Sequence, residues 1–231
     1  MIIAYVPARG GSKEILRKNL IEVGGVSLLE RTVRAAEQSH LIDQIWVSSE
    51  DSEIIEVALD LGAESGYHRP NELASDESTI GDGLLDFLEW FEVTQRSIPS
   101  VVVVLQPTSP FRDGLLIDNA IQQFLSISAA SMFSVSDVNE HPREMIVWHE
   151  EGSDWRSLLG LREAAQRQAY DQNIFYINGS MYLVRPEFVR EEKKLVVPGR
   201  SIPFVIPKDF GFEIDSSFDL LQIRRLMNGR P

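Results

Sequence analysis

The sequence predicts an α/β protein with a mostly parallel β-sheet covered by helices. The apolar runs at 2–6 and 101–105 are continuous, as expected for strands that are buried on both faces of a sheet. Amphipathic helical patterns lie between the apolar runs, so strands and helices alternate along the chain. The chain has 231 residues, 43% of them hydrophobic, which is enough to form the core of one domain.

The first two predicted helices have recognisable ends. Ser27, three residues before a glutamate, forms a capping-box pattern at the start of a helix near 27–39. After a short strand at 45–47, Ser49 can accept hydrogen bonds from the first N–H groups of a second helix. Gly62 can end that helix, because glycine readily adopts the left-handed conformation found after a helix C-terminus.

The alternation continues beyond the second helix. Residues 76–91 predict a third helix, and after the strand at 101–105 Asp113 can cap a fourth, which is followed by a strand at 131–135. The pattern stops at 141–173, a polar stretch that contains tryptophans. The remaining predicted elements are strands at 174–177, 181–184, 204–206 and 212–214 and a helix at 218–227.

We interpret 141–173 as an insertion within the single domain that spans 1–231. Its tryptophans, Trp148 and Trp155, are of a type often found at protein interfaces. An excursion that tucks back against the core is the alternative.

The composition limits the possible partners. The chain has 22 Lys and Arg against 35 Asp and Glu, and such a surface repels nucleic acid and anionic membranes. It has no cysteine, which excludes disulfides, thiolate nucleophiles and cysteine-based zinc sites. No apolar segment is long enough to span a membrane, and the start lacks the basic region of a signal peptide. We therefore expect a cytoplasmic protein.

The loop after the first strand concentrates positive charge in this acidic chain. Its glycines let the backbone approach a ligand and direct several N–H groups toward it. Its cations suit a highly charged anion such as a triphosphate, although the G-x-x-x-x-G-K-[ST] and G-x-G-x-x-G spacings are both absent. A solvated basic turn is the alternative. The residues concerned are Arg9, Gly10, Gly11, Lys13, Arg17 and Lys18.

Two further segments after predicted strands carry unusual side chains. Gln106 directly follows the strand at 101–105, where its amide could read a base edge, although an ordinary strand-to-helix turn is the alternative. Glu213 and Asp215 are two residues apart on a predicted strand, so their carboxylates would project together and could hold Mg²⁺. The alternative is a solvated strand end at which Asp215 caps the last helix. Arg69 offers another cation before a helix.

Several segments together resemble the acylneuraminate cytidylyltransferases, also called CMP-sialic acid synthetases. In order, they are PARGGSK with RKN, VSSED, RPNELASD, LQPTSPFR, NGSMY and FEIDSSFDL, and they cover nearly the whole chain. The resemblance implies a Rossmann-like nucleotidyltransferase fold, a three-layer sandwich in which 141–173 is a small dimerisation insertion. It also implies that CMP passes from CTP to the anomeric hydroxyl of a nonulosonic acid, such as sialic acid or legionaminate, and that pyrophosphate is released. Mg²⁺ or Mn²⁺ as cofactor and a homodimer as assembly are implied as well.

The resemblance also implies roles for the residues that match the family's motifs. The catalytic residues would be Arg9, Lys18 and Asp215, and the metal ligands would be Glu213 and Asp215. The nucleotide would be bound by Arg9, Gly10, Gly11, Ser12, Lys13, Asn19, Arg69 and Gln106. The sugar would be bound by Gln106, Arg143, Arg167, Gln168 and Asn178.

Some positions depart from the family's pattern. Glu14 and Leu16 stand where a glycine and a proline are usual, and Glu213 stands where the first metal-site aspartate is usual. Glu14 would place an anion beside the phosphates unless it points to solvent or to the metal. Glu14 and Glu213 motivate one alternative function, a nucleotide-binding regulatory protein without turnover. A second alternative is a 3-deoxy-manno-octulosonate cytidylyltransferase, against which the GGSK and RKN segments of the first loop argue.

Overall fold

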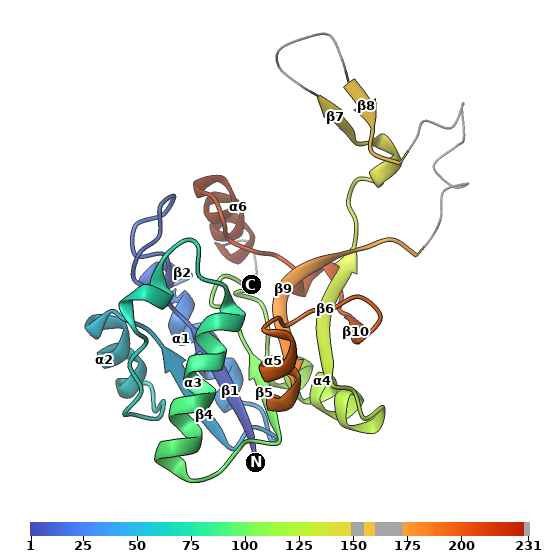
Figure 1. The fold of residues 1–231 in the computed structure, drawn as a ribbon. Helices are drawn as coiled ribbons and strands as arrows, with labels where there is room; N and C mark the ends of the chain where they lie inside the picture. The colour runs from blue at the N-terminus through green and yellow to red at the C-terminus, as the bar shows by residue number, and fades with distance from the viewer. Residues whose placement is uncertain (149–154, 160–172, 229–231) are drawn as a thin grey trace.

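The structure is a computed structural model that describes residues 1–148, 155–159 and 173–228. Its centre is a six-stranded sheet in the order β10-β6-β9-β5-β1-β4 (Figure 1). The strands are β1 (Ile2–Pro7), β4 (Gln44–Ser48), β5 (Val101–Val104), β6 (Ser131–Asp137), β9 (Phe175–Val184) and β10 (Ser201–Val205). The pairs β1–β4, β1–β5 and β10–β6 are parallel, whereas β9 is antiparallel to both of its neighbours. The predicted α/β fold with a mostly parallel sheet is confirmed.

Helices cover both faces of this sheet, because successive side chains of each strand point to opposite faces. In β1, Ala4 and Val6 pack into the core beneath α1, α2 and α4, while Ile3 and Tyr5 pack into the core beneath α3 and α5. Burial on both sides explains why the strand sequences are continuously apolar. The helices are α1 (Leu28–Glu37), α2 (Ser52–Asp60), α3 (Ile80–Gln95), α4 (Gly114–Ser126), α5 (Pro186–Glu192) and α6 (Ser217–Asn228).

Two helix starts differ from the prediction. The third helix begins at Ile80 and not at 76, because Thr79 and Asp82 form a reciprocal capping box there. The second helix is capped by Asp51, whose side chain accepts from the N–H of Glu53. The side chain of Ser49 accepts from the N–H of Asp51 instead, so it shapes the turn before the helix.

The second half of the sheet also differs from the prediction. Residues 174–177 and 181–184 belong to one strand, β9, whose pairing with β6 shifts register between Phe133 and Val135. The last sheet strand covers 201–205, slightly earlier than predicted. Residues 212–214 form no strand; Ile214 is buried in a small core with α6 and the hairpin of β2 (Glu22–Val23) and β3 (Val26–Ser27).

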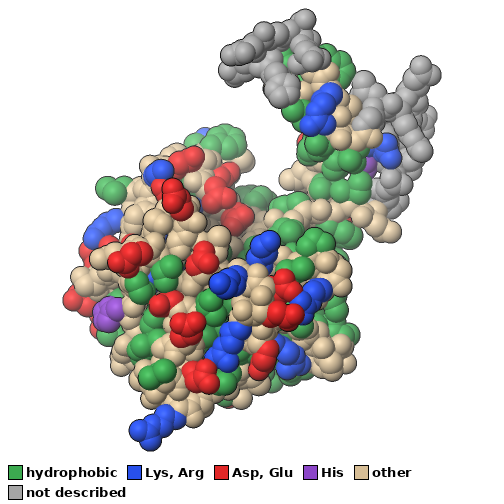
Figure 2. Space-filling model, viewed as in Figure 1, with side chains coloured by type: hydrophobic (Ala, Val, Ile, Leu, Met, Phe, Trp, Pro, Cys, Tyr) green, Lys and Arg blue, Asp and Glu red, His purple; other side chains and the backbone are tan. Residues whose placement is uncertain are grey.

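An arm extends from the C-terminal end of β6 and the N-terminal end of β9 and projects away from the rest of the chain (Figure 1). Its described part contains the short helix η3 (Pro142–Glu144) and a hairpin of β7 (Ile146–Trp148) and β8 (Trp155–Ser157). Trp148 and Trp155 are paired across this hairpin and are 60% and 48% exposed. Figure 2 shows hydrophobic side chains on the arm, whereas charged side chains of both signs are spread over the core. Among the described helices, none has the length and apolar character needed to cross a membrane.

Candidate active site

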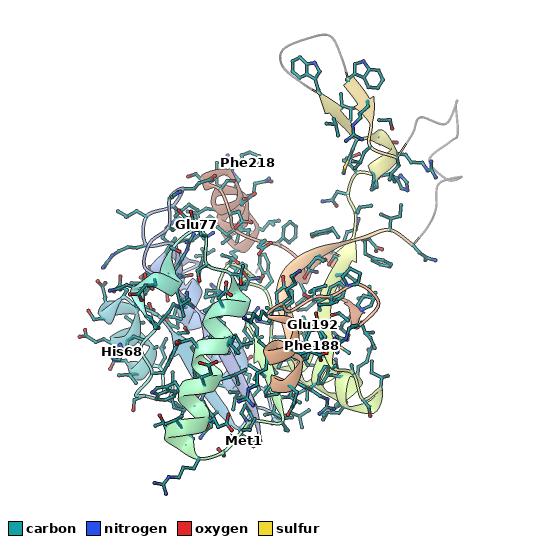
Figure 3. All side chains as sticks on the ribbon, viewed as in Figure 1. Met1, His68, Glu77, Phe188, Glu192 and Phe218 are labelled. Atoms are coloured by element: carbon teal, nitrogen blue, oxygen red, sulfur yellow. The ribbon has the colours of Figure 1, made fainter. Side chains whose placement is uncertain are left out.

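A cavity of about 290 Å³ lies at the carboxyl ends of β1 and β5. In Figure 3, Glu77, beside the cavity wall, lies at the end of the core opposite Met1, where β1 begins. Ligands of open α/β sheets bind at this end of the strands. The predicted site residues that line the cavity are Arg9, Ser12, Lys18, Asn19, Arg69, Gln106 and Asp215.

Gly10 of the first loop serves the packing of the loop against residues 50 and 51. The N–H of Gly10 donates to Glu50 Oε1 at 2.8 Å, so this group is engaged by a carboxylate. A Cβ on Gly10 would lie 2.5 Å from Asp51 Oδ2, which explains why a residue without a side chain stands here. Gly11 is exposed, and neither glycine lines the cavity. Asn19 is buried and donates its Nδ2 to the carbonyl of Arg9 at 2.8 Å, which holds the loop closed.

Carboxylates pair with three cations of this loop, of which Arg9 and Lys18 line the cavity and the predicted Lys13 does not. Asp76, at the end of the segment before α3, receives Arg9 Nη1 at 2.9 Å and Lys13 Nζ at 2.5 Å. Hydrogen bonds from Lys13 and Arg9 hold the pKa of Asp76 below its usual value. Lys18 Nζ lies 3.1 Å from Asp215 Oδ1. Each of these pairs has at least one well-exposed partner, so each is individually weak, and a more highly charged anion can replace the carboxylates.

The other charged residues of the loop face away from the cavity. Arg17 takes the left-handed conformation and pairs with Asp51 and Glu53 of the α2 region, so it is not part of the candidate site. Glu14 is exposed and does not line the cavity, and Leu16 is 82% exposed. The two departures in this loop therefore leave the cavity free of an added negative charge.

Arg69 supplies a cation from beneath the cavity. It is buried, and its Nε donates to Ser48 Oγ at 2.9 Å, which also accepts from the hydroxyl of Tyr5. No carboxylate of the described residues forms an ion pair with Arg69. A buried cation without a charged partner favours an anionic or electron-rich ligand in the cavity that it lines.

The loop after β5 meets β9 at Gln106. Gln106 Nε2 donates to the carbonyl of Gly179 at 3.0 Å. Gly179 has φ +65°, and a Cβ there would lie 2.5 Å from Glu213 Oε1 and 3.0 Å from Gln106 Nε2. Thr108 Oγ1 donates to the same Glu213 oxygen at 3.3 Å. Gln106, Gly179 and Glu213 therefore form a closely packed group at the side of the cavity.

The predicted metal ligands differ in their surroundings. The side chain of Asp215 is 70% exposed and lines the cavity, whereas Glu213 is half-buried and does not line it. Burial, and to a lesser extent the charge of Asp215, raises the pKa of Glu213 to about 7. Because 212–214 form no strand, the two carboxylates do not project from one strand face as predicted. No cluster of three metal-ligating side chains occurs among the described residues. A single carboxylate on the cavity wall, such as Asp215, can hold Mg²⁺ when phosphate oxygens of a ligand complete the coordination.

Two of the predicted sugar residues that the structure describes, Asn178 and Arg143, do not line the cavity. Asn178 has no exposed surface, because its amide accepts from Ser134 and the Ser180 N–H and donates to Ser136 inside the sheet. Arg143 lies in η3 on the arm. Arg167 and Gln168 lie outside the described residues. Of this predicted set, the cavity wall that the structure describes contains Gln106.

The segment before α3 contributes cavity residues that the sequence analysis did not identify. Leu73, Ser75, Asp76, Ser78, Thr79 and Ile80 line one wall. Ser78 Oγ is buried and has no hydrogen-bond partner among the described residues, so it can bind a ligand atom. The available signal was the Thr79–Asp82 capping box, which places 75–79 in a loop and not in a helix.

Known proteins resemble the chain in sequence and in fold. The family model described as cytidylyltransferase matches residues 3–184. The N-acylneuraminate cytidylyltransferase of Streptococcus agalactiae serotype V is 29% identical over 223 residues, which are 96% of this chain and 52% of that protein. The chain therefore spans about half the length of this relative.

Two further comparisons cover nearly the full length of both chains. The CMP-N,N'-diacetyllegionaminic acid synthase of Legionella pneumophila is 28% identical over 228 residues, 98% of this chain and 96% of that protein. A solved structure of CMP:2-keto-3-deoxy-manno-octonic acid synthetase in complex with CTP has a TM-score of 0.71 at 14% identity and covers 98% of each chain. At this identity the structural match supports the fold alone.

Proposed function

Because the chain belongs to the cytidylyltransferase family, we propose that it transfers CMP from CTP to the anomeric hydroxyl of a nonulosonic acid and releases pyrophosphate. The observation that carries this proposal is the cavity at the ends of β1 and β5, which gathers Arg9, Lys18, Arg69, Gln106 and Asp215. The names of relatives at 28–29% identity support an acidic nonulosonate as the acceptor.

In the proposed reaction, the acceptor hydroxyl attacks the α-phosphorus of CTP and loses its proton to water. The new O–P bond forms as the bond between the α-phosphorus and the bridging oxygen breaks, and pyrophosphate leaves with the electron pair. Arg9, Lys13 and Lys18 exchange Asp76 and Asp215 for phosphate oxygens and stabilise the charge on the leaving group. No protein side chain acts as the nucleophile.

Asp215 would hold Mg²⁺ or Mn²⁺, and Glu213, whose pKa is raised in part by the charge of Asp215, would be the second carboxylate near the ion. When bound, such an ion neutralises phosphate charge and orients the reacting oxygens. Lys18, at 3.1 Å from Asp215, would then be released to the phosphates.

The proposed assembly is a homodimer formed through the arm. The described arm exposes Met145, Ile146, Trp148, Trp155, Leu158 and Leu159, all between 40% and 60%. A monomer that exposes so many large apolar side chains on one projection is expected to bury them against another chain. Arg143 lies on this arm, so its proposed contact with the sugar would be made across the interface. The double variant Trp148→Ser, Trp155→Ser should have the molar mass of a monomer in light scattering, and the native chain that of a dimer. A native chain that is already monomeric would contradict the proposal.

The proposed setting is the cytoplasm, which contains CTP.

The decisive experiment measures the pyrophosphate released when the chain is incubated with CTP, Mg²⁺ and one acceptor: sialic, legionaminic, pseudaminic or 3-deoxy-manno-octulosonic acid. UTP is the control nucleotide. We expect release with at least one nonulosonate. Binding of CTP without release for any acceptor would favour the regulatory alternative.

Two substitutions test the roles of the site residues. Arg9→Ala and Asp215→Ala should each reduce turnover about a hundredfold, the effect of losing one contact to developing charge. Asp209→Ala is the matched control, because Asp209 is exposed and does not line the cavity. Near-normal turnover by a folded Asp215→Ala chain would refute the metal assignment.

A further inference from the structure

Arg112 is a buried cation that the proposed reaction does not use. It lies at the end of the loop between β5 and α4 and is 5% exposed. Burial lowers its pKa to about 9, which still leaves the guanidinium charged at neutral pH. The hydrogen bonds of this guanidinium to described residues all go to uncharged oxygens, two carbonyls and one hydroxyl.

These bonds connect three segments of the fold. Arg112 Nη2 donates to the carbonyl of Gln106 and to Thr32 Oγ1 of α1, each at 3.1 Å. Nη1 donates to the carbonyl of Ser180 in β9, and Nε has no partner among the described residues. Burial of a charge among neutral partners is unfavourable, and an apolar side chain of similar size would avoid this penalty. Stability alone therefore does not explain why an arginine stands at position 112.

The contacts form a closed ring around Gln106. Arg112 holds the main-chain carbonyl of Gln106, and Gly179 holds its side-chain Nε2 at 3.0 Å. Gly179 directly precedes Ser180, whose carbonyl is held by the same guanidinium. One of the two N–H groups of Nε2 is engaged by this carbonyl, whereas Oε1, an acceptor, has no hydrogen bond from the described residues, and Gln106 lines the cavity.

We propose that Arg112 is a positioning residue that fixes the loop after β5 against β9, so that Gln106 presents Oε1 to the cavity as a hydrogen-bond acceptor. The group that Oε1 would receive is a hydrogen-bond donor of the substrate, either the 4-amino group of cytosine or a hydroxyl of the acceptor. This inference rests on the proposed function, because it assigns a role within the same cavity.

A double-mutant cycle tests the inference. Arg112→Met keeps an unbranched apolar stem and removes the guanidinium with its donors. In the native background it should lower kcat/KM about tenfold, since small displacements of a substrate-binding group reduce rates strongly. In the Gln106→Ala background the same substitution should change kcat/KM less than about twofold, because the group that Arg112 positions is already gone. An equal loss in both backgrounds would mean that Arg112 supports only the fold, and would overturn the inference.

The Gln106→Ala chain also distinguishes the two sources of the donor. A reduced preference for CTP over UTP assigns the donor to cytosine. A raised KM for the acceptor with an unchanged nucleotide preference assigns it to the acceptor hydroxyl. A change in neither quantity would overturn the inference.

Two further variants keep the test decisive. Thr32→Val removes one anchor of Arg112 from α1 without touching the cavity wall, and it replaces Arg112→Met in the cycle if that chain does not fold. Arg185→Met is the matched control, because Arg185 Nε donates to the carbonyl of Ala129 and does not line the cavity. Coupling of Arg185 to Gln106 as strong as that of Arg112 would refute the inference. A native chain that neither turns over nor binds CTP would refute the proposed function and the inference together, whereas an active chain without coupling refutes only the inference.

Discussion

Gly179 is the position where a single methyl group should disturb both the fold and the site. Gly179→Ala would place a Cβ 2.5 Å from Glu213 Oε1 and 3.0 Å from Gln106 Nε2. Neither neighbour can move freely, because Glu213 accepts from Thr108 and Gln106 donates to the carbonyl of Gly179 itself. The residue also has φ +65°, a conformation that favours glycine.

The size of the effect follows from two separate penalties. A left-handed conformation disfavours an L-residue by about 1 kcal/mol, and overpacking of a filled site destabilises by about 2 kcal/mol. Gly199 offers a matched control, because its φ is +78° and a Cβ there would meet no atom within 4 Å. We therefore expect Gly179→Ala to lower the free energy of unfolding by about 3 kcal/mol and Gly199→Ala by about 1 kcal/mol.

Urea unfolding followed by circular dichroism measures both variants against the native chain. Calorimetry with CTP, or kcat/KM with a nonulosonate, measures the site in parallel. Gly179→Ala should weaken the site because Gln106 is displaced, whereas Gly199→Ala should leave it unchanged. Equal losses of stability in the two variants, or an unaltered site in Gly179→Ala, would refute the steric reasoning.

Three more predictions concern the cavity and its surroundings. Asp76→Asn should tighten CTP binding about threefold at low salt, because Arg9 and Lys13 no longer hold a competing carboxylate. The control is Glu77→Gln, which removes one negative charge from the neighbouring residue. An equal gain in CTP affinity in the control would contradict the prediction. The neutral form of Glu213 stabilises the folded chain fully below its unfolded pKa of 4.5, and this contribution is lost as the pH rises through about 7. In EDTA at pH 8, the free energy of unfolding of Glu213→Gln should therefore exceed that of the native chain by at most about 3 kcal/mol. Parallel pH profiles of the melting temperature in the two chains would contradict this prediction. Thr79→Ala should lower the free energy of unfolding by about 1 kcal/mol through loss of the capping box, and an unchanged thermal midpoint would show that the cap contributes nothing.

Local signals predicted the fold where a single segment determines the outcome. Asp113 caps α4 as its sequence position indicates, because the cap needs only the residues next to it. Ser49 and Asp51 are both good cap residues, and the choice between them depends on the turn that Ser49 makes with Asp51. β9 looked like two strands because Asn178 and Gly179 resemble a turn. The Asn178 amide accepts from Ser134 and donates to Ser136 of β6, and these bonds hold the strand together there.

The residues of the candidate site could likewise be predicted where a local pattern identifies them, and not where a contact between distant segments determines them. Loops at strand ends could be identified from the chain order alone, and Arg9, Lys18, Gln106 and Asp215 do line one cavity. The partnership of Asp76 with Arg9 joins segments that are distant in sequence, so no local pattern contains it. The exposure of Glu14 depends in the same way on contacts between its loop and distant residues, such as the bond from the Gly10 N–H to Glu50.

The position of β9 has a consequence for how the chain reaches its native state. β5 and β6 are separated by a gap that only β9 fills, with Val184 paired to Val102 on one side and to Ser131 on the other. During synthesis β1, β4, β5 and β6 therefore emerge before β9, the strand that joins β5 to β6, and long-range pairing of this kind makes folding slow. The cavity is completed later still, because Gln106 pairs with Gly179 and Lys18 pairs with Asp215, which lies 197 residues after it. A nascent chain that stops short of these residues has the basic loop but no assembled centre.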